Sequence, residues 1–373
     1  MLLRGILFTF AILLVCLLFS KDSAARAPEP PKPTRIIDLK NELCAEDLQQ
    51  YNIPITGADF ISNDELLVYT VCRIGSTVPA NRDKFQASDL YHLKAVIVDL
   101  KKGVIERRFD WPTHGKGSGV RITHAGDLLL HRDNVLDLIS ADGHPIQQLQ
   151  ITRMSLDDNT FVSVSPTIDT IAVSQGSETA TGPPVTSAAV YNSRNLHLLQ
   201  YWRDNADVWS IGASTGTAVR SALRGKLLVM RKLSTGPWKT MRKENAASIG
   251  VPVFIDDDEF AVPARDATLL YTTDGQLQAT LRCSIPFKAI VSREANALGA
   301  VWVKFAGHNP DPGRPKLTDA GIDIYRLPSL LRVTSIPINP PPSFGFDAAI
   351  SPSGSKLAIV DHLSVSVFEI AHR

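Results

Sequence analysis

One serine lies in a pattern that could carry nucleophilic catalysis. Gly212-Ala-Ser214-Thr-Gly216 matches the G-x-S-x-G elbow, in which a sharp turn between a strand and a helix exposes a serine nucleophile. Such a serine also needs a positioned histidine and an acid, and His308 and His362 lie downstream of it. The residues after Gly216 have the pattern of another strand and not of a helix, so we do not expect a hydrolase at this serine.

Patterns for phosphate or metal binding are incomplete. Gly115-Lys-Gly-Ser118 lacks the spacing of a phosphate-binding loop, and no helix pattern follows it. Residues 256–259 (Asp-Asp-Asp-Glu) offer oxygen ligands for calcium, but they lack the spaced calcium-loop pattern and fall where a turn is expected. The nine histidines show no zinc-site spacing. Local motifs therefore predict no metal site and no cofactor, although ligands from distant segments would leave no such spacing.

The charge balance bears on the class of partner. The chain has 39 Lys and Arg against 38 Asp and Glu, a formal net charge of +1, and the two signs are interspersed. No field of one sign is present to attract a phosphate backbone, so we expect no nucleic acid as a partner.

The N-terminus has the three parts of a secretory signal. Arg4 gives a basic start, residues 5–19 form a short apolar core, and Ala25-Arg-Ala27 is an A-x-A cleavage site. The apolar core is shorter than the roughly 20 residues that a spanning helix needs. We therefore predict a cleaved signal over residues 1–27 and a periplasmic or secreted protein; the alternative is an uncleaved membrane anchor, in which case the membrane is also a partner.

Two features follow the signal. Residues 28–33 (Pro-Glu-Pro-Pro-Lys-Pro) form a Pro-rich spacer, so the folded domain is expected over residues 34–373. Export would leave Cys44, Cys72 and Cys283 in an oxidising compartment. We predict a disulfide between Cys44 and Cys72, and the alternative is three unpaired cysteines that fill apolar space.

The chain repeats a strand-turn-strand unit. Its last copy places strands at residues 348–350, 356–360 and 365–370, and degenerate copies begin near residues 58, 120, 161, 208, 251 and 289. Repetition at a period of several tens of residues is typical of a stacked or radial architecture. The pattern predicts an all-β fold, a seven-bladed β-propeller of four-stranded antiparallel blades, with six or eight blades as alternatives.

The last unit supplies only three strands before the chain ends. Residues 34–39 can supply the fourth, and pairing of this N-terminal strand with the last blade would close the ring.

The repeats are similar to those of the WD-repeat-like and YVTN-type propellers. The closest parallels are the Ser-Pro-Ser-Gly turn at residues 351–354 and the Ser-Pro turn at 165–166. The resemblance covers nearly all of the expected mature chain, but the Gly-His and Trp-Asp pairs of true WD repeats are absent from the expected positions. It implies a fold and a habit of binding through one face, and it does not imply a reaction.

Long connections are expected to gather on one face of this propeller. Residues 73–92, 175–187 and 304–321 all separate the second and third strands of their units, and 110–119 and 339–346 are long connections between units. In propellers of this kind both sets of connections lie on the same face. Their charged and aromatic residues form the candidate binding face: Arg73, Arg82, Lys84, His92, Trp111, His114, Lys116, Arg203, Lys304, His308, Arg314 and Phe344.

The sequence thus favours a non-enzymatic, exported propeller that binds a protein or an envelope polymer through this face. The first alternative is a propeller hydrolase or lyase with a metal or a His/Asp pair in the central channel. The second is a carbohydrate or small-ligand sensor, in which Trp111 or Phe344 would stack on the ligand.

Overall fold

The computed structural model of the chain separates Met1–Lys32 from a second compact unit, Pro33–Arg373, and the second unit is the subject here. The structure describes residues 31–43, 56–75, 90–113, 118–132, 134–151, 160–177, 185–204, 208–222, 225–234, 237–245, 248–306, 317–342, 346–361 and 363–370. None of these residues forms a helix that is long and apolar enough to span a membrane.

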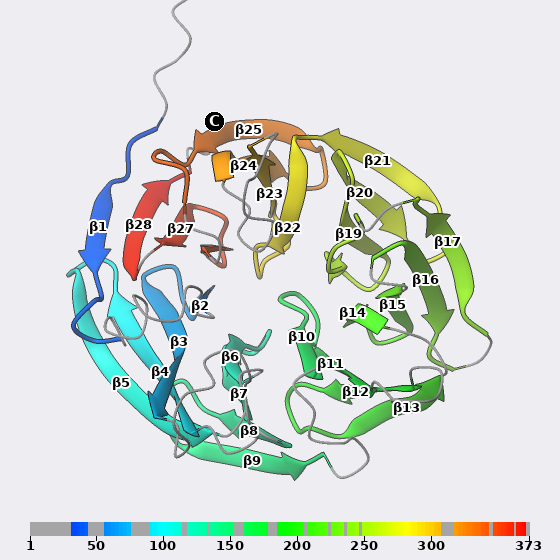
Figure 1. Cartoon of the computed structure of the whole chain (residues 1–373), viewed down its shortest axis with the longest axis horizontal. Helices are drawn as coiled ribbons and strands as arrows, with labels where there is room; N and C mark the ends of the chain where they lie inside the picture. The colour runs from blue at the N-terminus through cyan, green and yellow to red at the C-terminus, as the bar shows by residue number, and fades with distance from the viewer. Residues whose placement is uncertain are drawn as a thin grey trace, which may run out of the picture. The chain divides into compact units, whose positions relative to one another are not determined.

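Seven four-stranded antiparallel sheets stand as blades around a central axis, which confirms the predicted all-β propeller (Figure 1). The innermost strands are β2 (Thr56–Phe60), β6 (Gly119–Ile122), β10 (Thr160–Val164), β14 (Val208–Ala213), β18 (Val253–Phe254), β22 (Ile285–Val291) and β26 (Asp347–Ile350). The second strands are β3 (Glu65–Gly75), β7 (Leu128–Arg132), β11 (Thr170–Ser177), β15 (Thr217–Ala222), β19 (Glu259–Ala264), β23 (Ala297–Phe305) and β27 (Lys356–Asp361).

The third and outermost strands complete each blade. The third strands are β4 (Leu90–Asp99), β8 (Val135–Ile139), β12 (Val185–Asn192), β16 (Leu227–Lys232), β20 (Ala267–Thr272), β24 (Leu317–Arg326) and β28 (Ser364–Glu369). The outermost strands are β5 (Val104–Thr113), β9 (Pro145–Gln150), β13 (Leu198–Asp204), β17 (Lys239–Lys243), β21 (Leu277–Arg282), β25 (Leu331–Pro337) and, in the seventh blade, β1 (Arg35–Asp38).

Asp-Gly pairs set the tight turns between third and outermost strands. Gly143 and Gly275 have φ angles of 96° and 90°, in the left-handed region that glycine adopts without a steric penalty. Gly143 N–H donates to the Ser140 carbonyl at 2.8 Å, and Gly275 N–H donates to the Thr272 carbonyl at 2.9 Å. Both glycines therefore close tight hairpins between the third and outermost strands of their blades.

The hydrophobic core lies between the blades. Each of the seven apolar clusters among the described residues joins two neighbouring sheets, as where Val68 and Val96 of the first blade pack with Val360 and Val365 of the seventh. A blade has two faces to cover, so its strands are mostly apolar runs and not strict alternations. The ring must close so that the facing apolar surfaces of the first and seventh blades are buried against each other.

The N-terminal strand closes the ring as predicted. β1 pairs antiparallel with β28, with Arg35 opposite Val367 and Asp38 opposite Ser364. Ile37 and Leu39 are buried in the cluster between the seventh and first blades. The pairing covers the edge of β28 that would otherwise be open to other chains.

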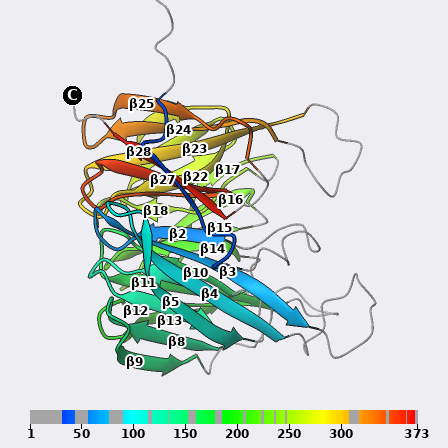
Figure 2. The ribbon, with the colours of Figure 1, turned by 90° about the vertical axis from the view of Figure 1, so that its left-hand side faces the viewer.

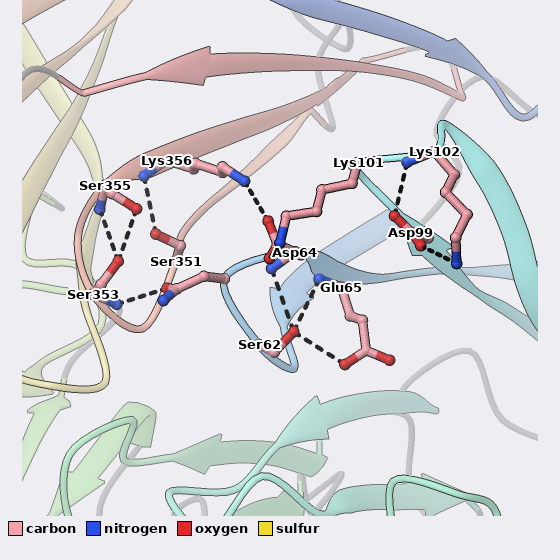
Figure 3. A network of polar contacts seen from close by, with 11 residues as sticks. Ser62, Asp64, Glu65, Asp99, Lys101, Lys102, Ser351, Ser353, Ser355 and Lys356 are labelled. Atoms are coloured by element: carbon pink, nitrogen blue, oxygen red, sulfur yellow. Dashed lines mark hydrogen bonds and ion pairs between the residues drawn. The ribbon is translucent and has the colours of Figure 1, made fainter.

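A polar network joins the same two blades through their turns (Figure 3). Lys356 Nζ donates to Asp64 Oδ1 at 2.6 Å, and the Ser353 N–H donates to Asn63 Oδ1 at 3.0 Å. Lys101 Nζ lies 2.7 Å from Asp64 Oδ2 on the other side of that carboxylate. Asp64 thus links the seventh blade to the first.

The two faces of the ring carry different connections, because all innermost strands run in the same direction. The antiparallel ladders place the ends of the second strands and the starts of the third strands on one face, and Figure 2 shows β3 running to that face, on the right. We call it the loop face, and define it by Gly75, Ser177 and Phe305, the last residues of β3, β11 and β23. The opposite turn face carries the turns at Asn63 and Gly126, between innermost and second strands.

Candidate functional site

Five residues of the candidate binding face lie within the described part of the chain. They are Arg73, His92, Trp111, Arg203 and Lys304, in strands β3, β4, β5, β13 and β23. The other seven lie outside the described residues: Arg82, Lys84, His114, Lys116, His308, Arg314 and Phe344.

The five described residues lie in strands near the loop face and not in loops. The strands are longer than the sequence pattern predicted, since β3 and β4 remain paired as far as Gly75 opposite Leu90. β5 alternates exposed and partly buried residues along Val104–Thr113, the period that a half-covered outer strand requires. Pro112 fits at its end because an outermost strand has no partner on one side.

Two of these residues make contacts within the first blade. His92 Nδ1 lies 2.5 Å from Asp110 Oδ1, and both side chains are partly exposed. Trp111 stacks on Phe109, with ring centroids 5.0 Å apart and an interplanar angle of 8°. Trp111 is therefore a partly buried ring that packs on its neighbour in the strand surface.

The sixth blade presents a similar polar and aromatic group. Lys304 Nζ donates to Asp319 Oδ2 at 2.8 Å and lies 5.4 Å from the centroid of the Trp302 ring. Arg203 is exposed on β13 of the third blade, opposite Ser187. The five described residues thus lie toward the loop face, in three separate blades.

The central channel holds a group of charged side chains that sequence reasoning did not predict. A cavity of about 560 Å³ is lined by the innermost strands, and its charged residues are Asp59, Arg121, Lys288, Arg293 and Asp347. All of these except Arg293 are charged residues among apolar neighbours, as in Ala58-Asp59-Phe60 and Val120-Arg121-Ile122. That contrast is the only signal that the sequence carries for them.

Lys288 and Asp347 form the tightest pair in this channel. Lys288 Nζ lies 2.5 Å from Asp347 Oδ1 and also donates to the Ala348 carbonyl at 3.4 Å. Asp347 accepts two further hydrogen bonds, from the N–H groups of Ala58 at 3.1 Å and Ala348 at 2.9 Å. Both carboxylate oxygens of Asp347 are therefore satisfied.

Asp59 and Arg121 are held more loosely. Arg121 Nη1 is 3.9 Å from Asp59 Oδ2, and that oxygen accepts a hydrogen bond from the Ile122 N–H at 3.3 Å. Removal from bulk water raises the pKa of Asp59, and the positive charges of Arg121 and Lys288 oppose this in part. Because 30% of the Asp59 side chain still faces the channel, the loss of hydration is partial.

Metal ligands are not gathered in the described part of the chain: no group of three or more His, Cys, Asp and Glu side chains could hold an ion there. The described residues that line the cavity include no histidine. The His/Asp pair that the structure does show, His92 with Asp110, lies on the two outer strands β4 and β5, outside the lining of the channel.

Two rejected motifs have structural roles. Ser214 is fully buried, and its Oγ accepts the Thr217 N–H at 3.2 Å in the turn between β14 and β15. Asp256 Oδ1 accepts the N–H groups of Asp258 and Glu259, both at 2.8 Å, in the turn between β18 and β19. The interpretation of residues 256–259 as a turn is confirmed, and the strand expected after Gly216 is β15.

Cys72 is disulfide-bonded and Cys283 is a free thiol. Cys44 lies outside the described residues, so its pairing with Cys72 stays a prediction. Burial raises the pKa of the Cys283 thiol to about 11, with the Asp323 charge as a further cause, which disfavours the reactive thiolate.

Comparison with known proteins adds evidence on the fold. No family model and no curated protein matches the chain. Among solved structures, a chain of the mitotic checkpoint complex is 12% identical, with a TM-score of 0.54 over 94% of this chain and 97% of that one. A functionally unknown protein from Desulfotomaculum acetoxidans is 13% identical, with a TM-score of 0.52 over 74% of this chain and 89% of that one.

A third neighbour is the Cps50 (Swd1) β-propeller domain of Myceliophteria thermophila. It is 12% identical, and its TM-score is 0.50 over 92% of this chain and 100% of that one. Identities this low show a shared fold and nothing more. By its fold, the chain is a seven-bladed β-propeller.

Proposed function

We propose that this chain is an exported, non-enzymatic binding protein that engages a protein or polymer partner of the cell envelope through its loop face. The observation that carries the proposal is an unequal extension of the blades. The second and third strands have 11 and 10 residues in the first blade, 8 and 8 in the third, and 9 and 10 in the sixth. The corresponding strands of the other four blades have 5 or 6 residues.

The additional residues extend only toward the loop face. At about 3.3 Å per strand residue, they raise the hairpin of the third blade by roughly 7 Å and those of the first and sixth blades by roughly 10 Å or more. A ring does not need such extensions to close, since four blades lack them. Three rigid extensions spaced around one face suit a partner that spans several blades, because binding sites on strands are better positioned than sites on loops alone.

The exposed groups on these extensions have the chemistry of an interface. Lys304 and Asp319, which pair with each other, are half exposed in the sixth blade, and Asp110 is half exposed beside His92 in the first. Trp302 and Trp111 add aromatic surface below them. Charged and aromatic side chains of this kind supply specificity and anchor contacts in protein interfaces.

Export is supported by two features of the chain. The N-terminus has the basic start, the apolar core and the Ala25-Arg-Ala27 site of a secretory signal. In addition, Cys72 is disulfide-bonded, and structural disulfides persist mainly in oxidising compartments.

A comparison of captured partners tests the binding role. The full chain would be tagged in its natural cells beside a variant in which residues 306–316 are replaced by a Gly/Ser linker of equal length. A matched control carries Asp142→Ser and His144→Ser in the turn between β8 and β9, on the turn face. We expect one partner that the control retains and the linker variant loses; retention by both variants, or no specific partner at all, would contradict the proposal.

A further inference from the structure

The cavity on the propeller axis has the size of a small-ligand site. Its volume is about 560 Å³, and sites for small molecules fall in the range of roughly 300–1,000 Å³. Residues of β2, β6, β10, β18, β22 and β26 line it, so six blades contribute to its wall.

Arg293 crosses the turn-face end of this cavity. It follows β22 in the sixth blade, yet its guanidinium donates to the carbonyls of Phe60 at 2.5 Å and Ile61 at 3.0 Å in the first. The same guanidinium lies 3.3 Å from the position that a Cβ on Gly126 would take in the second blade. The channel is therefore narrowed on the turn face, and a ligand would reach it from the loop face.

Arg121 is the cation in the cavity whose donors are left unused. Its Cζ lies 5.7 Å from the centroid of the Tyr69 ring, and its Nη1 is 3.9 Å from Asp59 Oδ2, which exceeds a hydrogen-bond distance. Within the part of the chain that the structure describes, the guanidinium makes no hydrogen bond. The side chain is 35% exposed, so a planar group with five N–H donors faces the cavity.

The other cations are already engaged. Lys288 is paired with Asp347, and Arg293 is held by two carbonyls. The cavity holds three cationic and two acidic side chains, a balance of one positive charge. This balance suits a monoanion, and a single guanidinium fork matches a carboxylate in bidentate geometry.

Three phenylalanines line the cavity at its loop-face end. Phe161 and Phe287 lie near the starts of β10 and β22, and Phe346 directly precedes β26, so all three are near the loop face. The rings of Phe287 and Phe346 are 5.7 Å apart, with an interplanar angle of 21°. Phe287 is an exposed residue at a register shift in β22, where Pro286 faces Trp302 and Lys288 faces Val301. Such bulges redirect side chains next to binding sites.

We propose that this cavity binds a small organic carboxylate with an apolar body, its carboxylate on Arg121 and its body against Phe161, Phe287 and Phe346. The site is separate from the partner surface of the proposed function, which lies on the extended hairpins of the first, third and sixth blades at the loop face. Either role can therefore fail without the other.

Asp59 makes the binding depend on pH. Its charged neighbours in the cavity are Arg121 on β6, Lys288 and Arg293 of the sixth blade and Asp347 on β26, and Tyr69 on β3 interacts with it from outside the cavity lining. A bound carboxylate would place a third negative charge beside Asp59 and would favour its protonated form. Protonated Asp59 can then donate a hydrogen bond to the ligand, so affinity rises as the pH falls.

Calorimetric titration of the full chain with phenylacetate and octanoate tests the site. We expect saturable binding, with phenylethanol and octanol, which lack the carboxylate, and acetate, which lacks the apolar body, at least about tenfold weaker. Arg121→Gln should weaken phenylacetate binding by about tenfold or more, and Phe287→Ala by about threefold to tenfold. Arg332→Gln, on exposed β25, should leave the affinity unchanged.

A second variant guards against loss of folding. Asp59→Asn keeps Arg121 but removes the competing carboxylate, so it should bind phenylacetate more tightly at pH 7 and lose the pH dependence. No saturable binding, equal binding of acids and alcohols, or unchanged affinity in a folded Arg121→Gln protein would overturn the proposal. Inorganic phosphate bound as tightly as phenylacetate would also overturn it, since the apolar wall would then contribute nothing.

Discussion

Lys356 of the last blade and Asp64 of the first form an ion pair of 2.6 Å across the join of the ring (Figure 3). Asp64 is shared with Lys101, and hydrogen bonds from Lys101 and then Lys356 lower its pKa below the ordinary value of 3.8. The two lysines differ in solvent exposure, because Lys356 is 16% exposed and Lys101 is 73% exposed. Solvent screens the charge of the exposed Lys101, so Lys356 is the stronger link between the blades, although Lys101 is the larger cause of the lowered pKa of Asp64.

Lys356→Met should therefore lower the free energy of unfolding by about 1 kcal/mol at pH 7, whereas Lys101→Met should lower it clearly less, because solvent screens that exposed lysine. Urea titrations of the three proteins measure this difference. Because the folded pKa of Asp64 is lowered, the stabilisation is present above 3.8 and is lost as the pH falls through the folded value. Equal losses in both variants, or a difference that persists at pH 2, would contradict this role of Lys356.

The N-terminal strand provides a second test of ring closure. Leu39 is fully buried between the seventh and first blades, whereas Ile36, three residues earlier, is exposed on β1. Leu39→Ala should cost about 2–4 kcal/mol through lost burial and the remaining cavity, and Ile36→Ala should change stability by less than about 0.5 kcal/mol. Thermal unfolding of both variants checks this prediction. A Leu39→Ala protein as stable as the Ile36→Ala protein would contradict a contribution of ring closure to stability.

Asp59 should be a source of instability at neutral pH. Burial raises its pKa, so the unfolded chain releases the proton first as the pH rises, and the free energy of unfolding falls through that interval. Asp59→Asn has no such titration and should raise the Tm by about 1–3 °C at pH 7, with little change at pH 3. Asp274→Asn, in an exposed turn, is the control. A lower Tm for Asp59→Asn at pH 7 would show that the carboxylate stabilises the channel.

The disulfide of Cys72 should connect it to Cys44. Peptide mapping without reduction should find a linked pair of peptides that contain these two cysteines, with Cys283 open to alkylation. Cys72→Ser should cost about 3 kcal/mol, since a bridge over a loop of this length restricts the unfolded chain by that order. A bridge from Cys72 to Cys283, or Cys44 recovered as a free thiol, would refute the pairing.

The fold could be predicted because its signals are local. The Asp142-Gly143 and Asp274-Gly275 turns and the apolar runs beside them specify hairpins within a few residues. The fourth unit, expected to begin near residue 208, has its innermost strand β14 at Val208–Ala213. The ends of the strands were harder to predict, because residues such as His92 and Trp111 continue the pairing of two strands that are both long.

The channel could not be predicted because its residues are distant in the sequence. Asp59 and Asp347 come from the first and seventh blades, and Ala58 N–H reaches Asp347 across 289 positions. Arg121 and Lys288 are each a lone charge in an apolar strand, which is also the pattern of a residue at a strand end. Only the closed ring brings these four side chains around one cavity.

Photo-crosslinking in the natural cells tests most directly whether the loop face binds an envelope partner. A photoreactive residue is introduced at one position at a time. The loop-face positions are His92, Arg203 and Lys304, in three different blades, and the turn-face controls are Asp142 and Asp274. If the loop face binds the partner, we expect the same envelope partner to be captured from all three loop-face positions and from neither control. Capture from the controls alone, or equally from both faces, would contradict it.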